Sequence, residues 1–472
     1  MARFARRHAL FGAVLLAATA VRVLAMLGFR GALLTPDSAD YVSVALRLRP
    51  HPIRPSGYPA MLRLLEPFHS VVVVTAIQHA MGLGIGVAGY ALLRRRFGLP
   101  GWGATLAMVP VLLSAYEVQL EHFLLADTLF SLLIILAVVL VMWRPDPPLG
   151  ICALAGLALA AATLARSQGL PLLIVFAVCM LIRSAGWRTI VGVLVLGAAF
   201  AIPAAGYAAW FHSAHGTFRL TSSDGAFLYA AVTPFADCAK IKPPPDERRL
   251  CLNVPASERS YSQTYIWDSN SPLRTIPGGE FGHLADRLGT NFALRAIKAQ
   301  PTAFLRAAWG SFWESFLLRG DTSAPGQLQR EGALLQRDFM FPAAPPALPR
   351  PYADRYYYAY DPAGPGLRVV QPYAGWVRAY QNLMVVSGPL LGLMTLIGLA
   401  GLIAAWRRLG GPALLPWLTG LCLLVVPAAT VDFSPRYLVC AVPPLCVAAA
   451  IGIQQIAGLV TRLRAGRRQP AL

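Results

Sequence analysis

Hydrophobic residues occur along this chain in runs of roughly 20, and the short stretches between the runs hold most of the charged residues. A helix of about 20 apolar residues is long enough to cross the hydrocarbon core of a bilayer. The pattern therefore predicts an all-α polytopic membrane protein with about ten transmembrane helices, over residues 9–29, 70–92, 100–116, 127–143, 149–164, 170–183, 189–211, 384–406, 412–430 and 437–460. The fifth and sixth runs are short, so the expected count ranges from roughly eight to twelve.

A long polar region, residues 212–383, separates the seventh expected span from the eighth and divides the chain into three parts. Residues 1–211 should form a transmembrane catalytic region with two acidic outer loops. We expect residues 212–383 to form an extracytoplasmic domain of mixed structure. Residues 384–472 should form a second transmembrane region that ends in a basic cytoplasmic tail.

Within the polar region, residues 290–318 carry apolar side chains at helical spacing. Pro301 should begin a second helix there, because proline is tolerated in the first helical turn but not in a helix interior. We therefore expect an amphipathic helix pair at the membrane interface. The tyrosine-rich segment 352–362 leaves two interpretations open, a packed aromatic loop or a surface that stacks against a sugar.

The positions of the charges change the interpretation of the net charge. A net charge of +19 could indicate nucleic-acid binding, but fifteen arginines and a single acid, Asp146, fall in the segments assigned to the cytoplasm. Such a bias is typical of the cytoplasmic loops of membrane proteins. We therefore expect no nucleic-acid partner, a multi-pass protein of the plasma (inner) membrane, and acidic loops and a polar region that face outward.

Two of the seven cysteines lie in the outward region, and the other five fall in expected spans. A disulfide between Cys238 and Cys251 is the expected state in an oxidising compartment, with two free thiols as the alternative. A thiol in a span is usually a small apolar filler.

Charged side chains that topology does not explain gather at the expected outer surface: Asp37, Asp40, Glu121, Asp127, Arg54, Arg166 and Arg436. Each has an ordinary alternative, since an aspartate near a helix start is often an N-cap and an acid at the membrane edge is often solvated. Their coincidence in short loops that helix packing can bring together predicts a site. Arg22 lies inside the first span, where a charge is costly and a functional role is the default hypothesis.

This combination of charges suits glycosyl transfer from a lipid phosphate. A carboxylate is needed as the base that takes the proton of the acceptor. The departing phosphate is already a weak base, so it needs positive charge from arginines or from a divalent ion rather than a proton. Glycosidases differ, because they need two catalytic carboxyl groups.

Several short motifs occur in one order along the chain: Asp37 four residues before Tyr41, RPSGYP at 54–59, Asp127 in ADTLF, Arg166 in ARSQGL, the helix motif KAQPTAFL, and Arg436 with Tyr437 in RYLVCAVP. They resemble motifs of the glycosyltransferase-C superfamily, the polyprenyl-phosphate-sugar-dependent membrane enzymes that include protein O-mannosyltransferases and lipid A aminoarabinose transferases. Many members carry Asp-Glu where this chain has Asp37-Ser38, which bears on metal binding. Ser167 and Gln168 also depart from the pattern.

The resemblance implies an inverting glycosyltransferase that moves a sugar from a polyprenyl-phosphate donor to an extracytoplasmic acceptor, which could be a cell-envelope glycan, a lipid or a protein. Asp37 would be the general base. The donor's phosphate and sugar would contact Arg54, Tyr58, Arg166, Arg436 and Tyr41. Asp40, Glu121 and Asp127 would be the contacts of a divalent metal ion, if one is used.

The rival interpretation is a transporter or flippase of lipid-linked sugars. Transporters usually place ionisable groups and broken helices near the bilayer midplane, often in internal repeats. The sequence has no internal repeat, and its unexplained charges concentrate at one surface. These two features favour the enzyme.

Overall fold

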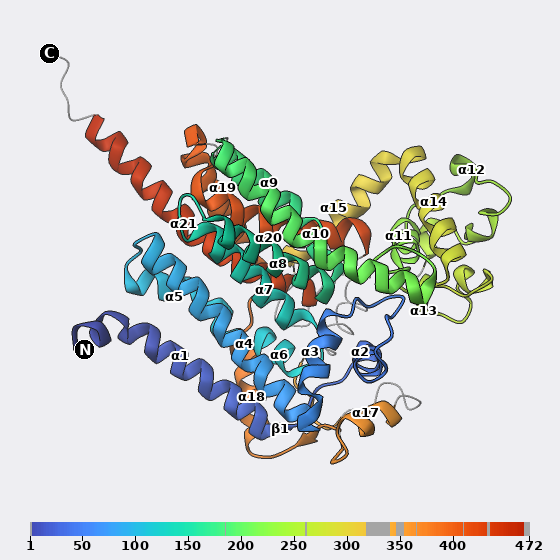
Figure 1. Ribbon diagram of the computed structural model, residues 1–472, viewed down its shortest axis with the longest axis horizontal. Coiled ribbons are helices and arrows are strands. Elements are labelled where there is room, and N and C mark those ends of the chain that lie inside the picture. Colours follow the sequence, from blue (N-terminus) through green and yellow to red (C-terminus); the bar gives the residue numbers. More distant parts are fainter. Residues whose placement is uncertain are drawn as a thin grey trace.

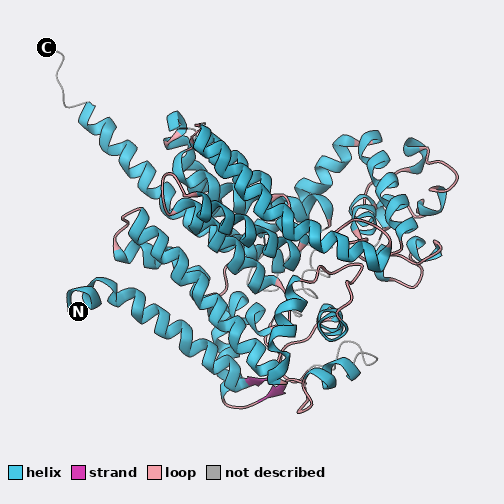
Figure 2. Ribbon diagram, viewed as in Figure 1, coloured by secondary structure: helices cyan, strands magenta, loops and turns pink. Residues whose placement is uncertain are grey.

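The computed structural model describes residues 2–184, 186–259, 262–317, 340–345, 354–364, 366–408, 410–431 and 435–466. Helices dominate this part of the chain. Its two strands, β1 (Phe29–Arg30) and β2 (Arg368–Val369), pair antiparallel (Figure 2). The predominantly helical membrane fold is the predicted one. In residues 212–383 the described part forms helices, loops and the short strand β2, which pairs with β1 outside the region.

The described residues up to His215 contain ten α-helices: α1 (Ala2–Gly28), α2 (Pro36–Arg47), α3 (Gly57–Leu65), α4 (Val71–Ala91), α5 (Gly101–Leu113), α6 (Ala115–His122), α7 (Asp127–Met142), α8 (Leu149–Ala165), α9 (Leu172–Arg183) and α10 (Trp187–His215). The outward region adds α11 (Asp224–Val232), α12 (Cys238–Ile241), α13 (Thr264–Trp267), α14 (His283–Ala299), α15 (Pro301–Leu317), α17 (Asp354–Tyr360) and α18 (Tyr373–Leu383). The chain continues with α19 (Gly388–Ala404), α20 (Leu414–Thr430) and α21 (Pro435–Gly466).

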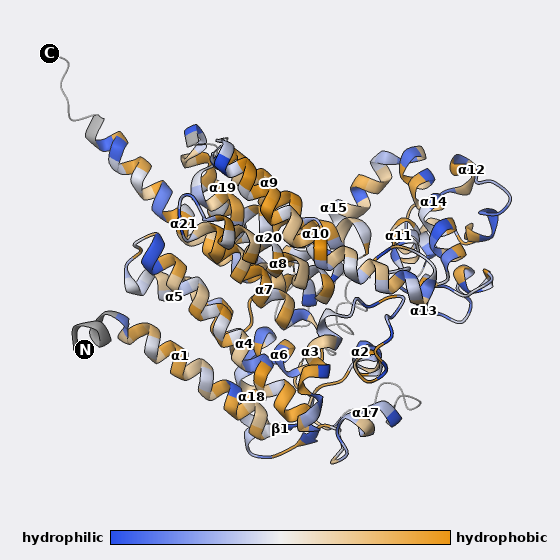
Figure 3. Ribbon diagram, viewed as in Figure 1, coloured by the Kyte–Doolittle hydropathy of each residue, from blue (hydrophilic) through white to orange (hydrophobic). Residues whose placement is uncertain are grey.

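A helix occupies each of the ten expected spans, but not every helix is long enough to cross a bilayer alone. Five helices pass by length and composition: His8–Gly28, Val71–Arg96, Trp187–His215, Gly411–Thr430 and Arg436–Arg464. The bent pairs α5–α6 (47°) and α18–α19 (50°) raise this to seven, while α7, α8 and α9 are apolar but shorter. Figure 3 shows hydrophobic residues concentrated over α7–α10 and α19–α21. A count of ten spans stays a prediction.

The outward region divides between two hydrophobic cores. Residues from Ala226 to Ala296 pack around a core of their own (Figure 1), which includes the half-buried Cys238–Cys251 disulfide. The later segment packs elsewhere, because α17 lies against α2 and α18 against α1. Tyr357 and Tyr360 are fully buried there, and the Tyr360 hydroxyl donates to the Leu62 carbonyl at 2.8 Å. These contacts favour a packed aromatic segment over a sugar-stacking surface.

The amphipathic helix pair is confirmed, with Pro301 as the first residue of α15. One side of α15 packs against α19 and α20. Another side leaves Leu305, Trp309 and Trp313 about half exposed or more, at 64%, 61% and 49%. Residues four apart share a helix face, so these three form one apolar stripe beside the membrane helices.

Candidate functional site

Asp37 lies in the first turn of α2, one position after Pro36. The cap position belongs to Thr35, whose N–H donates to the Ser38 hydroxyl at 2.9 Å. The interpretation of Asp37 as an N-cap is therefore wrong. Ser38 in turn donates to the Leu124 carbonyl at 3.0 Å, so it joins the start of α2 to the α6–α7 connection.

Backbone hydrogen bonds hold these two loops side by side. The Leu33 N–H donates to the His122 carbonyl, and the Leu124 N–H donates to the Leu33 carbonyl, both at 3.0 Å. The pairing fixes the end of α1 against the α6–α7 connection. As a result, the segment before α2 lies beside the segment before α7.

Asp37 lies between two arginines from distant parts of the chain. Arg54, in the loop before α3, donates to one carboxylate oxygen, and Arg436 Nη1, at the start of α21, donates to the other at 3.0 Å. The three side chains are between 14% and 16% exposed. Asp40 lies nearby, with Oδ2 3.9 Å from Arg54 Nε and Oδ1 3.8 Å from His51 Nε2.

A second ion pair joins Asp127, the first residue of α7, to Arg166, just after α8. Tyr437 connects this pair to the first one. Its ring centroid is 5.2 Å from Cζ of Arg166 and 5.6 Å from Cζ of Arg436. Three predicted phosphate contacts and two predicted acids therefore form one cluster at one end of the helices.

Electrostatics keep Asp37 ionised in this arrangement. Burial alone would raise the pKa of its carboxyl group, but the positive charges of Arg54 and Arg436 outweigh burial and lower the pKa to about 2. A carboxylate with so low a pKa accepts a proton poorly. Movement of either arginine to another anion would raise the pKa of Asp37 towards its ordinary value.

The two tyrosines predicted to contact the donor form a buried wall beside the cluster. Tyr41 and Tyr58 pack edge to face, with ring centroids 4.9 Å apart. The Tyr58 hydroxyl donates to Gln78 Oε1 at 2.7 Å, and Gln78 Nε2 donates to the carbonyls of Glu121 and Phe123. Tyr58 is fully buried, so it positions the α3 segment rather than facing a ligand.

The predicted metal contacts do not come together. Asp40 lies near Arg54, Asp127 pairs with Arg166, and Glu121 pairs with Arg22 inside the membrane helices. Among the described residues, no group of three or more His, Cys, Asp or Glu is placed to hold a metal ion. Asp40, Glu121 and Asp127 therefore do not form a shared metal site among the described residues.

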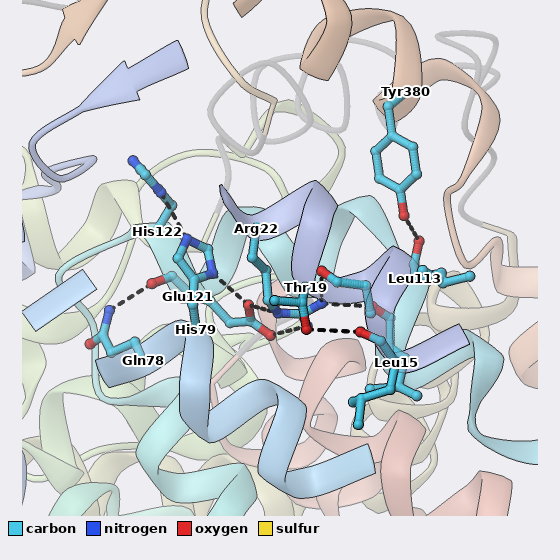
Figure 4. A network of polar contacts seen from close by, with 11 residues as sticks. Leu15, Thr19, Arg22, Gln78, His79, Leu113, Glu121, His122 and Tyr380 are labelled. Atoms are coloured by element: carbon cyan, nitrogen blue, oxygen red, sulfur yellow. Dashed lines mark hydrogen bonds and ion pairs between the residues drawn. The ribbon is translucent and has the colours of Figure 1, made fainter. Parts of the chain in front are cut away.

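A polar network is buried between α1, α4 and α6 (Figure 4). Arg22 binds both carboxylate oxygens of Glu121, at 2.8 and 2.6 Å, and both side chains are at most 2% exposed. The other members follow in a chain: His79 Nδ1 lies 2.7 Å from Glu121 Oε2, His122 Nδ1 lies 3.1 Å from His79 Nε2, and the Phe29 carbonyl lies 2.7 Å from His122 Nε2. The network links three membrane helices through hydrogen bonds.

The sequence analysis identified Arg22 and Glu121 of this network but not Gln78, His79 and His122. It also did not identify Glu117, although polar residues inside apolar runs are a usable signal. Glu117 is 5% exposed, and its Oε1 has no partner within the described part of the chain. It lines a cavity of about 10 Å³, which is about the space that one water molecule occupies.

Two broken helices meet beside Glu117. The α5–α6 break falls at Ser114, and α18 ends one residue before Met384. The Ala115 N–H donates to the Met384 carbonyl at 2.6 Å, and the Tyr380 hydroxyl donates to the Leu113 carbonyl. Groups near each break thus form hydrogen bonds with backbone groups that the other break leaves without a helical partner. Backbone groups inside a membrane need such partners.

No family model matches this chain, and no curated protein matches it. Solved structures that resemble it include the crystal structure of ArnT from Cupriavidus metallidurans bound to undecaprenyl phosphate, with 13% identity, a TM-score of 0.37, and coverage of 94% of this chain and 77% of that one. The apo form of the same ArnT has 12% identity and a TM-score of 0.33 at the same coverage. A similarity at this level assigns no role to any residue of this chain.

Proposed function

We propose that the chain is an inverting membrane glycosyltransferase that transfers a sugar from a polyprenyl-phosphate donor to an extracytoplasmic acceptor. The observation that carries the proposal is Asp37 held between Arg54 and Arg436, beside the Arg166–Asp127 pair. Three arginines provide the positive charge that a departing phosphate needs. One carboxylate provides the base that an acceptor hydroxyl needs.

In the proposed mechanism, the donor phosphate competes with Asp37 for its arginines. When Arg54 and Arg436 turn to the phosphate, the pKa of Asp37 rises from about 2 towards its ordinary value. The acceptor oxygen then attacks the anomeric carbon while the bond from that carbon to the phosphate oxygen breaks. The phosphate keeps the bonding electron pair, and Asp37 takes the proton. A single displacement inverts the anomeric centre.

The charge pattern supports an outward-facing site in the plasma (inner) membrane. The fifteen arginines assigned to the cytoplasm lie in the loops and tails expected opposite Asp37. The acceptor would reach Asp37 from the outside, and the lipid tail of the donor would lie in the membrane. The acceptor would be a cell-envelope glycan, a lipid or a protein.

The test is Asp37→Asn in the purified full chain with a polyprenyl-phosphate sugar. Transfer should fall by about a hundredfold or more, because a general base contributes about that much or more. Donor binding should persist, since the three arginines remain. Asp146→Asn, at the opposite ends of the helices, is the matched control and should keep its turnover. A folded Asp37→Asn protein with wild-type turnover would contradict the proposal.

One observation favours the second candidate, a transporter or flippase of lipid-linked sugars. Two broken helices meet beside buried ionisable residues, Glu117 and Glu121, an arrangement used by many transporters. The same purified protein in vesicles separates the two functions. Movement of a lipid-linked sugar that survives Asp37→Asn but is lost in Glu117→Gln would favour the transporter.

A further inference from the structure

We propose that the chain binds the phosphate of an anionic phospholipid in a pocket at the N-terminal ends of α8 and α10, remote from Asp37. The pocket has a volume of about 270 Å³, near the lower end of the range of ligand sites, roughly 300 Å³. One wall is the α7–α8 connection, and the other is the turn from α9 to α10. This site is independent of glycosyl transfer.

The pocket lies at the opposite ends of the helices from the Asp37 cluster. Helix α8 begins at the pocket with Leu149 and ends beside Arg166. Its 17 residues correspond to about 25 Å at 1.5 Å per residue. A ligand bound in the pocket therefore cannot touch the proposed active site. On the predicted topology, the pocket faces the cytoplasmic leaflet.

The mouth of the pocket is positively charged. Arg183 and Arg188 line it, with Asp146 as the acidic counterpart. Arg183 is held in place by the carbonyls of Val141, Arg144 and Pro145. Arg188 lies 5.8 Å over the Trp187 ring, and no carboxylate among the described residues forms an ion pair with it. Its guanidinium group is available to a ligand.

Two helix starts add to this positive potential. Helix α8 follows Pro148 and α10 follows Gly186, and neither helix has a side chain that caps its first N–H groups. Uncapped N–H groups and the helix dipole both favour an anion, particularly a phosphate. The arginines and the first turns of α8 and α10 therefore both favour a phosphate, and they lie on the two walls of the pocket.

The surroundings identify the source of the phosphate as a lipid. The pocket floor is apolar, with Cys152, Met180 and Gly192 among its residues. The outer faces of α9 and α10 beside it are exposed and hydrophobic, including Ile182 at 38% and Leu194 at 65%. A diacyl lipid can place its chains on these faces while its phosphate lies at the arginines. A soluble anion would gain nothing from them.

The test measures binding of dioleoylphosphatidylglycerol to the purified full chain by native mass spectrometry and by melting temperature. The lipid should bind and raise the melting temperature, whereas dioleoylphosphatidylcholine should have a much smaller effect. Arg188→Gln should weaken binding about fivefold, the effect of one arginine at a lipid surface. Arg464→Gln removes an exposed arginine from the same expected side outside the pocket, and it should bind as the wild type does.

A second variant separates loss of binding from loss of folding. Thr189 lines the pocket in the first turn of α10, where an aspartate favours the helix but repels a phosphate. Thr189→Asp should keep or raise the melting temperature without lipid and should lose the lipid effect. Equal binding by Arg188→Gln and the wild type would overturn the proposal. So would an equal rise in melting temperature with inorganic phosphate, which would assign the site to a soluble anion.

Discussion

At the scale of single residues, the most important feature is the pairing of Asp37 with two arginines. A carboxylate that is paired with two arginines is a weak base, and the same arginines are the groups that a phosphate would bind. On the proposed function, donor binding and activation of the base would be one event. Without donor, the paired Asp37 would also be unable to activate water, which would protect a reactive lipid-linked sugar from hydrolysis during its entry.

Arg436→Gln tests this coupling through pH. Asp37 must be ionised to act, so activity is present above its pKa and is lost as the pH falls through that value. Removing Arg436 removes part of the interaction that lowers the pKa to about 2, so the acid limb of kcat/KM should move to higher pH. The pH profile of transfer checks this, with Arg464→Gln as the control that should leave the limb in place. An unmoved limb would separate Arg436 from the base.

The buried Arg22–Glu121 pair predicts a stability effect. Glu121→Gln leaves Arg22 charged and without its carboxylate at a site 2% exposed, which should cost about 3–5 kcal/mol of unfolding free energy. Arg63→Gln breaks the more exposed pair with Glu66 and should cost less than about 1 kcal/mol. Thermal denaturation of both variants in detergent makes the comparison. Equal losses would show that the buried network contributes no more than a surface pair.

At the scale of elements, local patterns predicted the helices but not their partners. Pro301 marked the start of α15, and each expected span marked the position of a helix, because both signals act within a few residues. The sequence predicted only that Asp37, Arg54 and Arg436 lie at the same membrane surface, and not that they form ion pairs. The Leu33–Phe123 bridge and the packing of α18 on α1 depend on three-dimensional contacts between distant segments, which no local pattern encodes.

The contact between the two broken helices gives a prediction at this scale. Tyr380→Phe removes the hydroxyl that donates to the part-buried Leu113 carbonyl and leaves that acceptor without this donor. The expected cost is about 1–3 kcal/mol, measured as a lower melting temperature. Trp376→Phe, on the same helix but 55% exposed, should change stability less. Equal melting temperatures for Tyr380→Phe and the wild type would show that the hydrogen bond does not hold the breaks together.

At the scale of the whole molecule, the predicted topology places the disulfide-containing domain outside and the arginine-rich loops inside. Ser257→Cys lies on the exposed surface of that domain, and Arg95→Cys lies after α4 in the arginine run. A membrane-impermeant thiol reagent should label Ser257→Cys in intact cells and Arg95→Cys only after permeabilisation. The opposite pattern would reverse the orientation and place Asp37 in the cytoplasm.

The ion pair between Asp37 and Arg436 also sets an order of events during synthesis. Its partners are 399 positions apart, so at roughly 5–20 residues per second a ribosome completes α21 about 20–80 s after it has made α2. Until then Asp37 has Arg54 alone, and the cluster cannot close around a phosphate. A nascent chain already inserted in the membrane would thus be unable to consume donor until its last helix arrives.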